Sequence, residues 1–204
     1  MAIEIELKAH VADSQAIKLL LSEKAQYLGA FEKEDSYWFP KESSSESSSD
    51  AYSGQKKFRI RKEKLVSPEG IEKSAYMVGY KRKEVRDGIE INDEQEFEAR
   101  PSETVEEFFR ELGLEPRVSK RKRGWAYSLN GITAELVHVE GLGWFVELEI
   151  LEDGKLGESF EVAKTRLLDL LFNLGIDKKS IESRYYTEML LAKTETDGAV
   201  DLSA

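Results

Sequence analysis

Acidic side chains recur at every second position in several segments of the chain. These carboxylates are Glu4, Glu6, Glu94, Glu96, Glu98, Glu147 and Glu149. Oxygen ligands of this kind suit hard divalent cations such as Mg²⁺, which proteins usually hold with one or two carboxylates. The spacing therefore makes six of these residues candidate metal ligands, with Glu4, Glu6, Glu147 and Glu149 first and Glu96 and Glu98 next.

Basic side chains follow the same two-residue spacing in other segments. The candidates for binding a polyanion are Lys8, Arg59, Arg61, Lys81, Lys120 and Lys122. Arginine binds phosphate oxygens in a bidentate manner, and lysine acts as a compact charge. Together, the two sets predict a site for metal ions and a phosphate-rich ligand.

Alternation with a period of two indicates that these side chains lie on β-strands, with apolar residues on the opposite faces. In the segment 145–150, Glu147 and Glu149 alternate with Val146, Leu148 and Ile150. Buried charges are costly unless they are paired or bound to metal. An open sheet with one face packed on helices would therefore leave these charged side chains in water. A closed antiparallel barrel of about eight strands instead places them inside, with its apolar face under helices outside. The sequence therefore predicts an α+β fold of this kind.

Helical periodicity predicts helices over 13–28, 102–112 and 160–174. We expect strands over 3–10, 37–39, 57–61, 75–83, 89–98, 118–129, 132–139, 144–151 and 183–191. One barrel domain would then span 1–192. It would carry a flexible serine-rich loop over 41–54, with a disordered tail over 193–204.

Composition excludes several classes of function. The chain has 204 residues, a formal net charge of −10 and no cysteine. An acidic chain is not a general nucleic-acid binder, and thiolate chemistry is absent. We find neither a signal peptide nor an apolar run of about 18 residues, and so expect a cytoplasmic protein without a membrane span. The oligomeric state stays open, a homodimer included.

The motifs resemble those of the CYTH family, also called triphosphate tunnel metalloenzymes. Residues 4–8 resemble the E-x-E-x-K signature of that family, and 139–149 resemble its V-x-G-L-G-x-F-x-E-x-E stretch. Further likenesses lie at 35–39, 58–61, 79–81, 94–98, 120–122 and 186–190, in the family's order. The sequence departs from the pattern at Glu94, Lys122, Val137 and Tyr185. Glu135 lies two residues before Val137 and is an alternative source of the carboxylate expected there.

The resemblance implies a divalent-metal-dependent enzyme that uses Mg²⁺ or Mn²⁺ and acts on a triphosphate. ATP, inorganic triphosphate and thiamine triphosphate are the candidate substrates. Segment 35–39 and the single-domain length favour a class IV adenylyl cyclase-like activity, which forms cyclic AMP and pyrophosphate. A triphosphatase that releases orthophosphate is the alternative, and a non-catalytic polyphosphate or nucleotide binder is the third hypothesis. Glu6 and Lys8 are the candidate catalytic residues, with Lys8 either activating the nucleophile or binding phosphate.

Overall fold

A computed structural model describes residues 3–41, 57–100, 102–152 and 160–200 of the chain. The strands within these residues are β1 (Ile3–His10), β2 (Gln26–Pro40), β3 (Phe58–Val66), β4 (Glu72–Arg86), β5 (Ile89–Glu98), β6 (Leu114–Leu129), β7 (Ile132–Val139) and β8 (Gly143–Glu152). The helices are α1 (Ser14–Lys24), α2 (Ser102–Glu111), α3 (Phe160–Asn173), the 3₁₀ turn η3 (Lys178–Ser180) and α4 (Tyr186–Val200).

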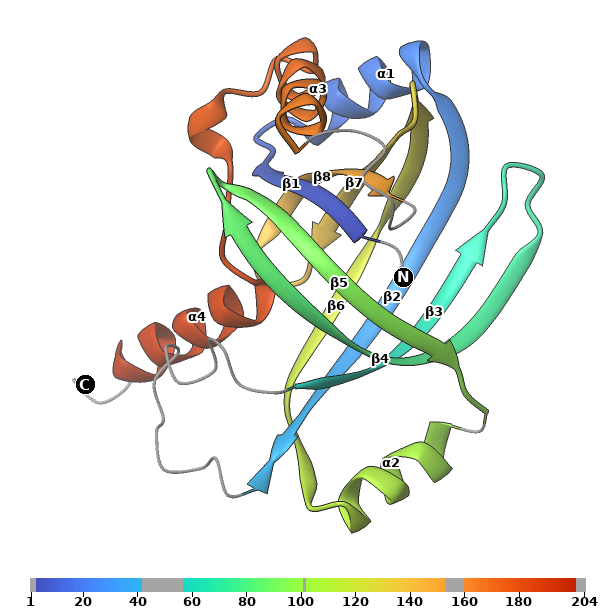
Figure 1. The fold of residues 1–204 in the computed structure, drawn as a ribbon, viewed down its shortest axis with the longest axis vertical. Helices are drawn as coiled ribbons and strands as arrows, with labels where there is room; N and C mark the ends of the chain where they lie inside the picture. Colours follow the sequence, from blue (N-terminus) through green and yellow to red (C-terminus); the bar gives the residue numbers. More distant parts are fainter. Residues whose placement is uncertain (1–2, 42–56, 101, 153–159, 201–204) are drawn as a thin grey trace.

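The eight strands form a closed barrel in the order β1-β5-β4-β3-β2-β6-β7-β8. Every neighbouring pair is antiparallel. Figure 1 shows α1 and α3 together at one end of the barrel and α2 at the opposite end. The predicted α+β fold, a closed antiparallel barrel with helices outside, is confirmed.

The apolar faces of the strands form the cores beneath the helices. Ile5, Leu7 and Ala9 of β1 are buried in one cluster with Leu21 of α1 and Leu167 of α3. The alternate residues of the same strand therefore point into the barrel, as the spacing predicts.

Two smaller clusters hold the remaining helices. Phe109 of α2 packs with Trp38, Ile60 and Val78 on the outer face of β2, β3 and β4. Tyr186 and Met189 of α4 belong to a separate cluster that includes Phe31, Val137, Val139 and Phe145. Helix α4 is therefore packed onto the barrel from its first residues.

The first helix is shorter than we predicted, and the second strand is longer. Helix α1 ends at Lys24, and Ala25 already has extended backbone angles. Gly29, directly after the predicted helix 13–28, lies at a β-bulge with φ +138. A Cβ there would lie 2.3 Å from the carbonyl oxygen of Val66, so this close strand contact requires glycine.

The predicted strand over 183–191 is wrong, because α4 begins at Tyr186. The Glu188 carboxylate accepts a hydrogen bond from the Tyr185 backbone N–H at 2.9 Å, which closes the first turn as a capping box does. The same helix includes 193–200, part of the segment that we expected to be a disordered tail. Of the serine-rich segment 41–54, all but residue 41 lies outside the described residues.

Among the described residues, no helix has both the length and the apolar character that a membrane span requires.

Candidate functional site

The barrel encloses a cavity of about 230 Å³ whose lining is almost entirely charged. Among the described residues, its lining has eight basic and eight acidic side chains, four tyrosines and Thr187. All of the predicted site residues except Glu98 contribute to it. A larger hollow of about 600 Å³, lined mainly by residues of β2, β3, β4 and β6, shares only Lys122 with the predicted site. The candidate site is therefore the interior of the barrel.

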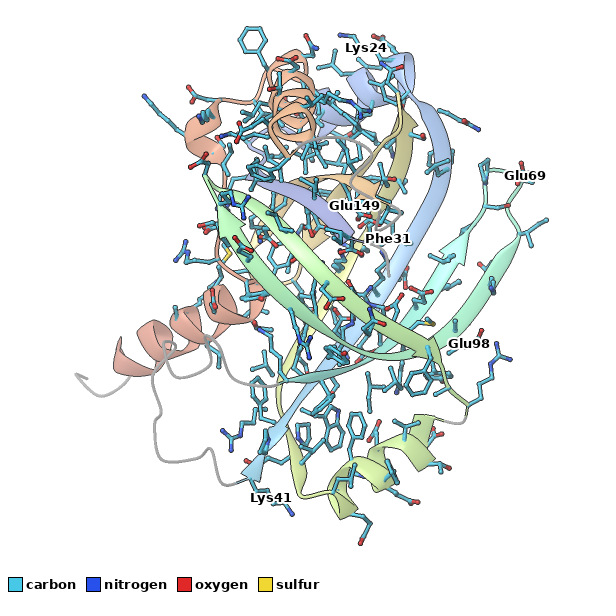
Figure 2. All side chains as sticks on the ribbon, viewed as in Figure 1. Lys24, Phe31, Lys41, Glu69, Glu98 and Glu149 are labelled. Carbon is cyan, nitrogen blue, oxygen red and sulfur yellow. The ribbon has the colours of Figure 1, made fainter. Side chains whose placement is uncertain are left out.

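Glu98 is the predicted metal ligand that the fold does not bring into this cavity. It lies at the end of β5, where its carboxylate pairs with Arg100 at 2.6 Å in an exposed position. Figure 2 shows Glu98 at the edge of the sheet and Glu149 within the barrel. We leave Glu98 out of the proposed site.

Lys81 of β4 lies where several carboxylates converge. Its Nζ is 2.8 Å from Glu4 Oε2, 3.3 Å from Glu6 Oε2 and 3.4 Å from Glu94 Oε2. Burial alone would lower the pKa of Lys81, but these carboxylates raise it well above its usual value. The ammonium is therefore firmly charged and held on the acidic side of the cavity.

Asp35 of β2 lies at the centre of a second group of charged side chains. Its fully buried carboxylate accepts hydrogen bonds from Arg61 Nε at 2.7 Å and Arg61 Nη2 at 3.0 Å. Lys120 Nζ lies 2.9 Å from the same carboxylate. Burial alone would raise the pKa of Asp35, but Lys120 and Arg61 hold it well below its usual value. Asp35 thus orients two of the predicted phosphate-binding cations.

Lys122 of β6 pairs with two further carboxylates of the cavity, Glu147 and Glu135. Its Nζ is 2.7 Å from Glu147 Oε2 and 3.3 Å from Glu135 Oε2, and Lys33 lies 2.9 Å from Glu135 Oε1. Burial opposes ionisation, but the cations nevertheless lower the pKa values of both Glu135 and Glu147. Glu135 thus lies in the cavity, whereas Val137 is buried in the apolar cluster beside α4.

Lys8 is held between the barrel and the chain segment that leads into α4. Its Nζ donates to Glu90 Oε1 at 3.1 Å and to the Arg184 carbonyl at 2.7 Å. Lys83 repeats the arrangement, donating to Glu90 at 2.9 Å and to the Ser183 carbonyl at 2.6 Å. These contacts are those of an ammonium that positions other groups. A role for Lys8 in activating a nucleophile stays a prediction.

The carboxylates also repel one another. Burial and the carboxylates of Glu4 and Glu6 raise the pKa of Glu149 to about 8. Burial likewise raises the pKa of Glu4, with Glu94 and Glu6 adding to the effect and Lys81 opposing it. A bound cation would relieve this repulsion.

The donor set fits a hard divalent cation in its chemistry, although the ligands are not preassembled. In the described part of the chain, no group of three acidic or histidine side chains is arranged as a metal-binding cluster. Instead, the Lys81 ammonium lies at the point that Glu4 and Glu6 share. Glu4, Glu6 and Glu149 would hold a cation there once Lys81 moved aside.

Aromatic side chains line another part of the cavity. Lys57 Nζ lies 3.6 Å and Lys83 Nζ 3.9 Å from the centre of the Tyr185 ring. Burial lowers the pKa of Lys57 to about 8, with Glu188 opposing that effect. Tyr186 packs edge-on against Phe145 at a centroid distance of 4.9 Å. The tyrosine at 185, a departure from the CYTH pattern, therefore narrows the site with an aromatic ring.

The structure adds charged residues that we did not place in the site from the sequence. They are Lys33, Asp35, Lys57, Lys83, Glu90 and Glu94. A signal for several of them was present, because Glu90 and Glu94 continue the alternation of Glu96 along β5. Lys33 and Asp35 likewise share one face of β2.

Comparison with known proteins agrees with this architecture. A family model described as CYTH domain matches residues 2–186. No curated protein matches the chain. The structure is similar to that of the PH1819 protein from Pyrococcus horikoshii OT3, with a TM-score of 0.76 and 26% identity over 93% of this chain and 99% of that one.

Two further solved structures share the fold at lower identity. A candidate adenylate cyclase from Vibrio parahaemolyticus has a TM-score of 0.66 and 16% identity, covering 92% of this chain and 97% of its own. A candidate adenylyl cyclase from Hippeastrum, described as having a dominant triphosphatase activity, has a TM-score of 0.59 and 16% identity over 96% of both chains.

The closed barrel with a charged interior defines the class of triphosphate tunnel proteins. The chain belongs to the CYTH family. Enzymes of this family act on triphosphates and use divalent metal ions.

Proposed function

We propose that this chain is a divalent-metal-dependent triphosphatase that releases orthophosphate from a small triphosphate held in the barrel. The observation that supports this most directly is the balanced lining of the cavity, to which the described part of the chain contributes eight basic and eight acidic side chains. A triphosphate brings about four negative charges, which a neutral buried site accepts only with added cations. Binding is therefore expected to require metal.

The basic side chains are placed to hold phosphate oxygens from several directions. Arg59 and Arg61 come from β3, Lys81 from β4, and Lys120 and Lys122 from β6. Each is already held by a carboxylate, so its position is fixed before a ligand arrives. Such preorganised charges stabilise the negative charge of a phosphoryl-transfer transition state.

Glu4, Glu6 and Glu149 would hold a divalent ion, which would supply positive charge to the phosphate oxygens. Arg61 and Lys120, oriented by Asp35, would hold the transferring phosphoryl group. Lys122, which is paired with Glu147, would hold a further phosphate oxygen of the chain.

The size of the cavity favours hydrolysis at a terminal phosphate over cyclisation. A volume of about 230 Å³ is below the roughly 300–1,000 Å³ of pockets that enclose drug-sized organic ligands. A cyclase must bring the ribose hydroxyl to the α-phosphorus, which requires the sugar inside the charged cavity. Hydrolysis of the terminal phosphate needs only the phosphate chain there.

The adenylyl cyclase-like activity, which we favoured from the sequence, becomes the second candidate, and the tyrosines support it. Tyr37, Tyr80 and Tyr185 line the cavity and offer aromatic surface for a nucleobase. The family contains relatives described by both activities, so the fold is compatible with either.

The test is a product analysis with three substrates. Inorganic triphosphate, ATP and thiamine triphosphate are each incubated with the protein and Mg²⁺ or Mn²⁺, and the products are separated. We expect orthophosphate, with inorganic triphosphate as the best substrate. Cyclic AMP with pyrophosphate would select the cyclase instead, and tight binding without turnover would select a binding protein.

The site assignment is tested by a double variant with Glu6→Gln and Glu147→Gln. We expect it to lose turnover, because it removes two carboxylates that line the cavity from the neighbouring strands β1 and β8. Glu140→Gln, on an exposed residue outside the barrel interior, is the matched control and is expected to retain turnover. Full turnover in the double variant would refute the assignment.

A further inference from the structure

Glu94 lies between two of the side chains proposed to bind phosphate. Its Oε1 is in contact with Arg59 Nη2, and its Oε2 is 3.4 Å from Lys81 Nζ. The Glu94 side chain is only 14% exposed, and Lys81 is its cross-strand partner on β4. A single partly buried carboxylate thus engages two cations that a triphosphate would need.

The same lysine is also engaged by Glu4 and Glu6, which are the proposed metal ligands. A divalent cation bound by those two carboxylates would compete with the ammonium for the same oxygens. Two positive charges at one point repel, so a bound cation would displace Lys81 from the carboxylates. The displaced ammonium is then available to phosphate oxygens.

We propose that Glu94 makes triphosphate binding conditional on a divalent cation, because it holds Arg59 and Lys81 until the cation rearranges the carboxylates around Lys81. This inference rests on the proposed function, since it concerns the same ligand. Without metal, a triphosphate must displace Glu94 from both cations and enter beside the charges of Glu4 and Glu6. With metal, the charges of Glu4 and Glu6 would be offset and Lys81 already displaced, so the triphosphate would have to displace Glu94 from Arg59 alone.

Glu94 is therefore a positioning residue that couples two binding events. Such coupling is measured as the ratio of triphosphate affinities with and without metal. A carboxylate that served only as a structural partner of Arg59 would change folding stability but would leave this ratio unaltered.

The experiment measures binding of a bis-methylene triphosphate analogue, which is not hydrolysed, by calorimetry in EDTA and in Mg²⁺. We expect Glu94→Gln to tighten binding in EDTA by about 5- to 150-fold, the usual range of such couplings, while binding in Mg²⁺ changes far less. Complexation of the metal by the analogue in solution is the same for every variant and cancels in the comparison.

Asp93→Asn is the matched control. Asp93 adjoins Glu94 on the same strand, but its carboxylate pairs with Arg82 at 3.7 Å and accepts a hydrogen bond from Gln95 at 3.0 Å. The variant makes the same change in net charge, and we expect its affinity ratio to match that of the wild type. An equal effect in both variants would show that only net charge matters and would overturn the inference.

A second measurement does not depend on the Glu94 variant being folded. Lys81→Met removes the ammonium from the carboxylates, and we expect it to bind Mn²⁺ without triphosphate more tightly than the wild type, as followed by electron paramagnetic resonance. Unchanged or weaker Mn²⁺ binding, or an unaltered ratio in Glu94→Gln, would overturn the inference while leaving the proposed function intact. Failure of the wild type to bind the analogue in either buffer would instead overturn the proposed function.

Discussion

Glu149 offers a prediction in which folding stability and metal binding change in opposite directions. Its carboxylate lies in the barrel close enough to Glu4 and Glu6 that burial and their charges raise its pKa to about 8. The variant Glu149→Gln keeps the shape of the side chain and removes its ability to ionise. We expect the metal-free variant to be more stable than the wild type at alkaline pH.

The magnitude follows from proton linkage. An acid whose pKa rises from the ordinary 4.5 to about 8 on folding contributes stability at low pH, and this contribution is lost as pH rises from 4.5 through 8. The full difference corresponds to about 4–5 kcal/mol at 1.36 kcal/mol per unit. Because neighbouring side chains and water rearrange around the ionised group, we expect about 1–3 kcal/mol at pH 9.

The assay is urea unfolding in EDTA at pH 5 and pH 9. At pH 5 the wild-type carboxyl is still protonated, so the two proteins should have similar free energies of unfolding. At pH 9 the variant should be more stable. Glu140→Gln, an exposed substitution of the same kind, should show no difference at either pH.

Added Mg²⁺ or Mn²⁺ should reverse the order. A ligand that binds only the folded state stabilises it in proportion to its affinity, and the variant has lost one of the proposed ligands. We therefore expect a large metal-induced gain for the wild type and a small one for the variant. If Glu149→Gln were no more stable than the wild type at pH 9, or if its advantage were the same at pH 5, the reasoning would be refuted.

Three further predictions concern the buried carboxylate of Asp35, the close strand contact at Gly79 and the aromatic ring of Tyr185. Asp35→Asn should lower the free energy of unfolding at pH 7 by about 3–5 kcal/mol, since it leaves Arg61 and Lys120 buried without their partner; a loss in urea unfolding below about 1 kcal/mol would contradict this. Gly79→Ala should lower it by about 1–3 kcal/mol, because a Cβ would lie 2.4 Å from the Gln95 carbonyl oxygen, and an unchanged urea midpoint would show that β4 and β5 can separate there. Tyr185→Ser should raise kcat/KM for ATP relative to inorganic triphosphate by widening the cavity, and an unaltered ratio of the two would exclude Tyr185 as a selective residue.

The general design of the barrel could be predicted from the alternation of residue types. Glu4, Glu6 and Lys8 point inward and Ile5 and Leu7 pack outward, because a strand allows no other arrangement once one face is apolar. Closure followed from the cost of leaving so many charges on a buried sheet. The same reasoning placed Glu147 and Glu149 on the inner wall.

The ion pairs were beyond prediction because they depend on register between strands. Lys81 meets Glu94 because β4 and β5 pair in one register, and Asp35 lies directly opposite both Arg61 and Lys120 across two different strands. A shift of one residue in either pair would exchange the inner and outer faces. Sequence spacing gives the face of each residue but not its partner.

The last helix was missed because its first residues resemble a strand motif. Segment 187–193 consists mainly of good helix formers, so intrinsic propensity favoured a helix. In the structure this helix begins beside the cavity, where Lys8 and Lys83 hold the carbonyls of Arg184 and Ser183. Because we predicted a strand here, we did not expect the residues just before α4 to contact lysines of the site.

The paired interior explains how one cavity can be stable when empty and still bind a highly charged ligand. Unpaired cations at these depths would destabilise the fold, whereas Asp35, Glu94 and Glu147 satisfy them and fix their positions. The consequence is that a phosphate group must exchange with a carboxylate at nearly every contact. Binding then depends on a new positively charged partner for the displaced carboxylates, and a divalent cation can be that partner. On this reasoning, the metal requirement arises from the composition of the whole lining rather than from one ligand set.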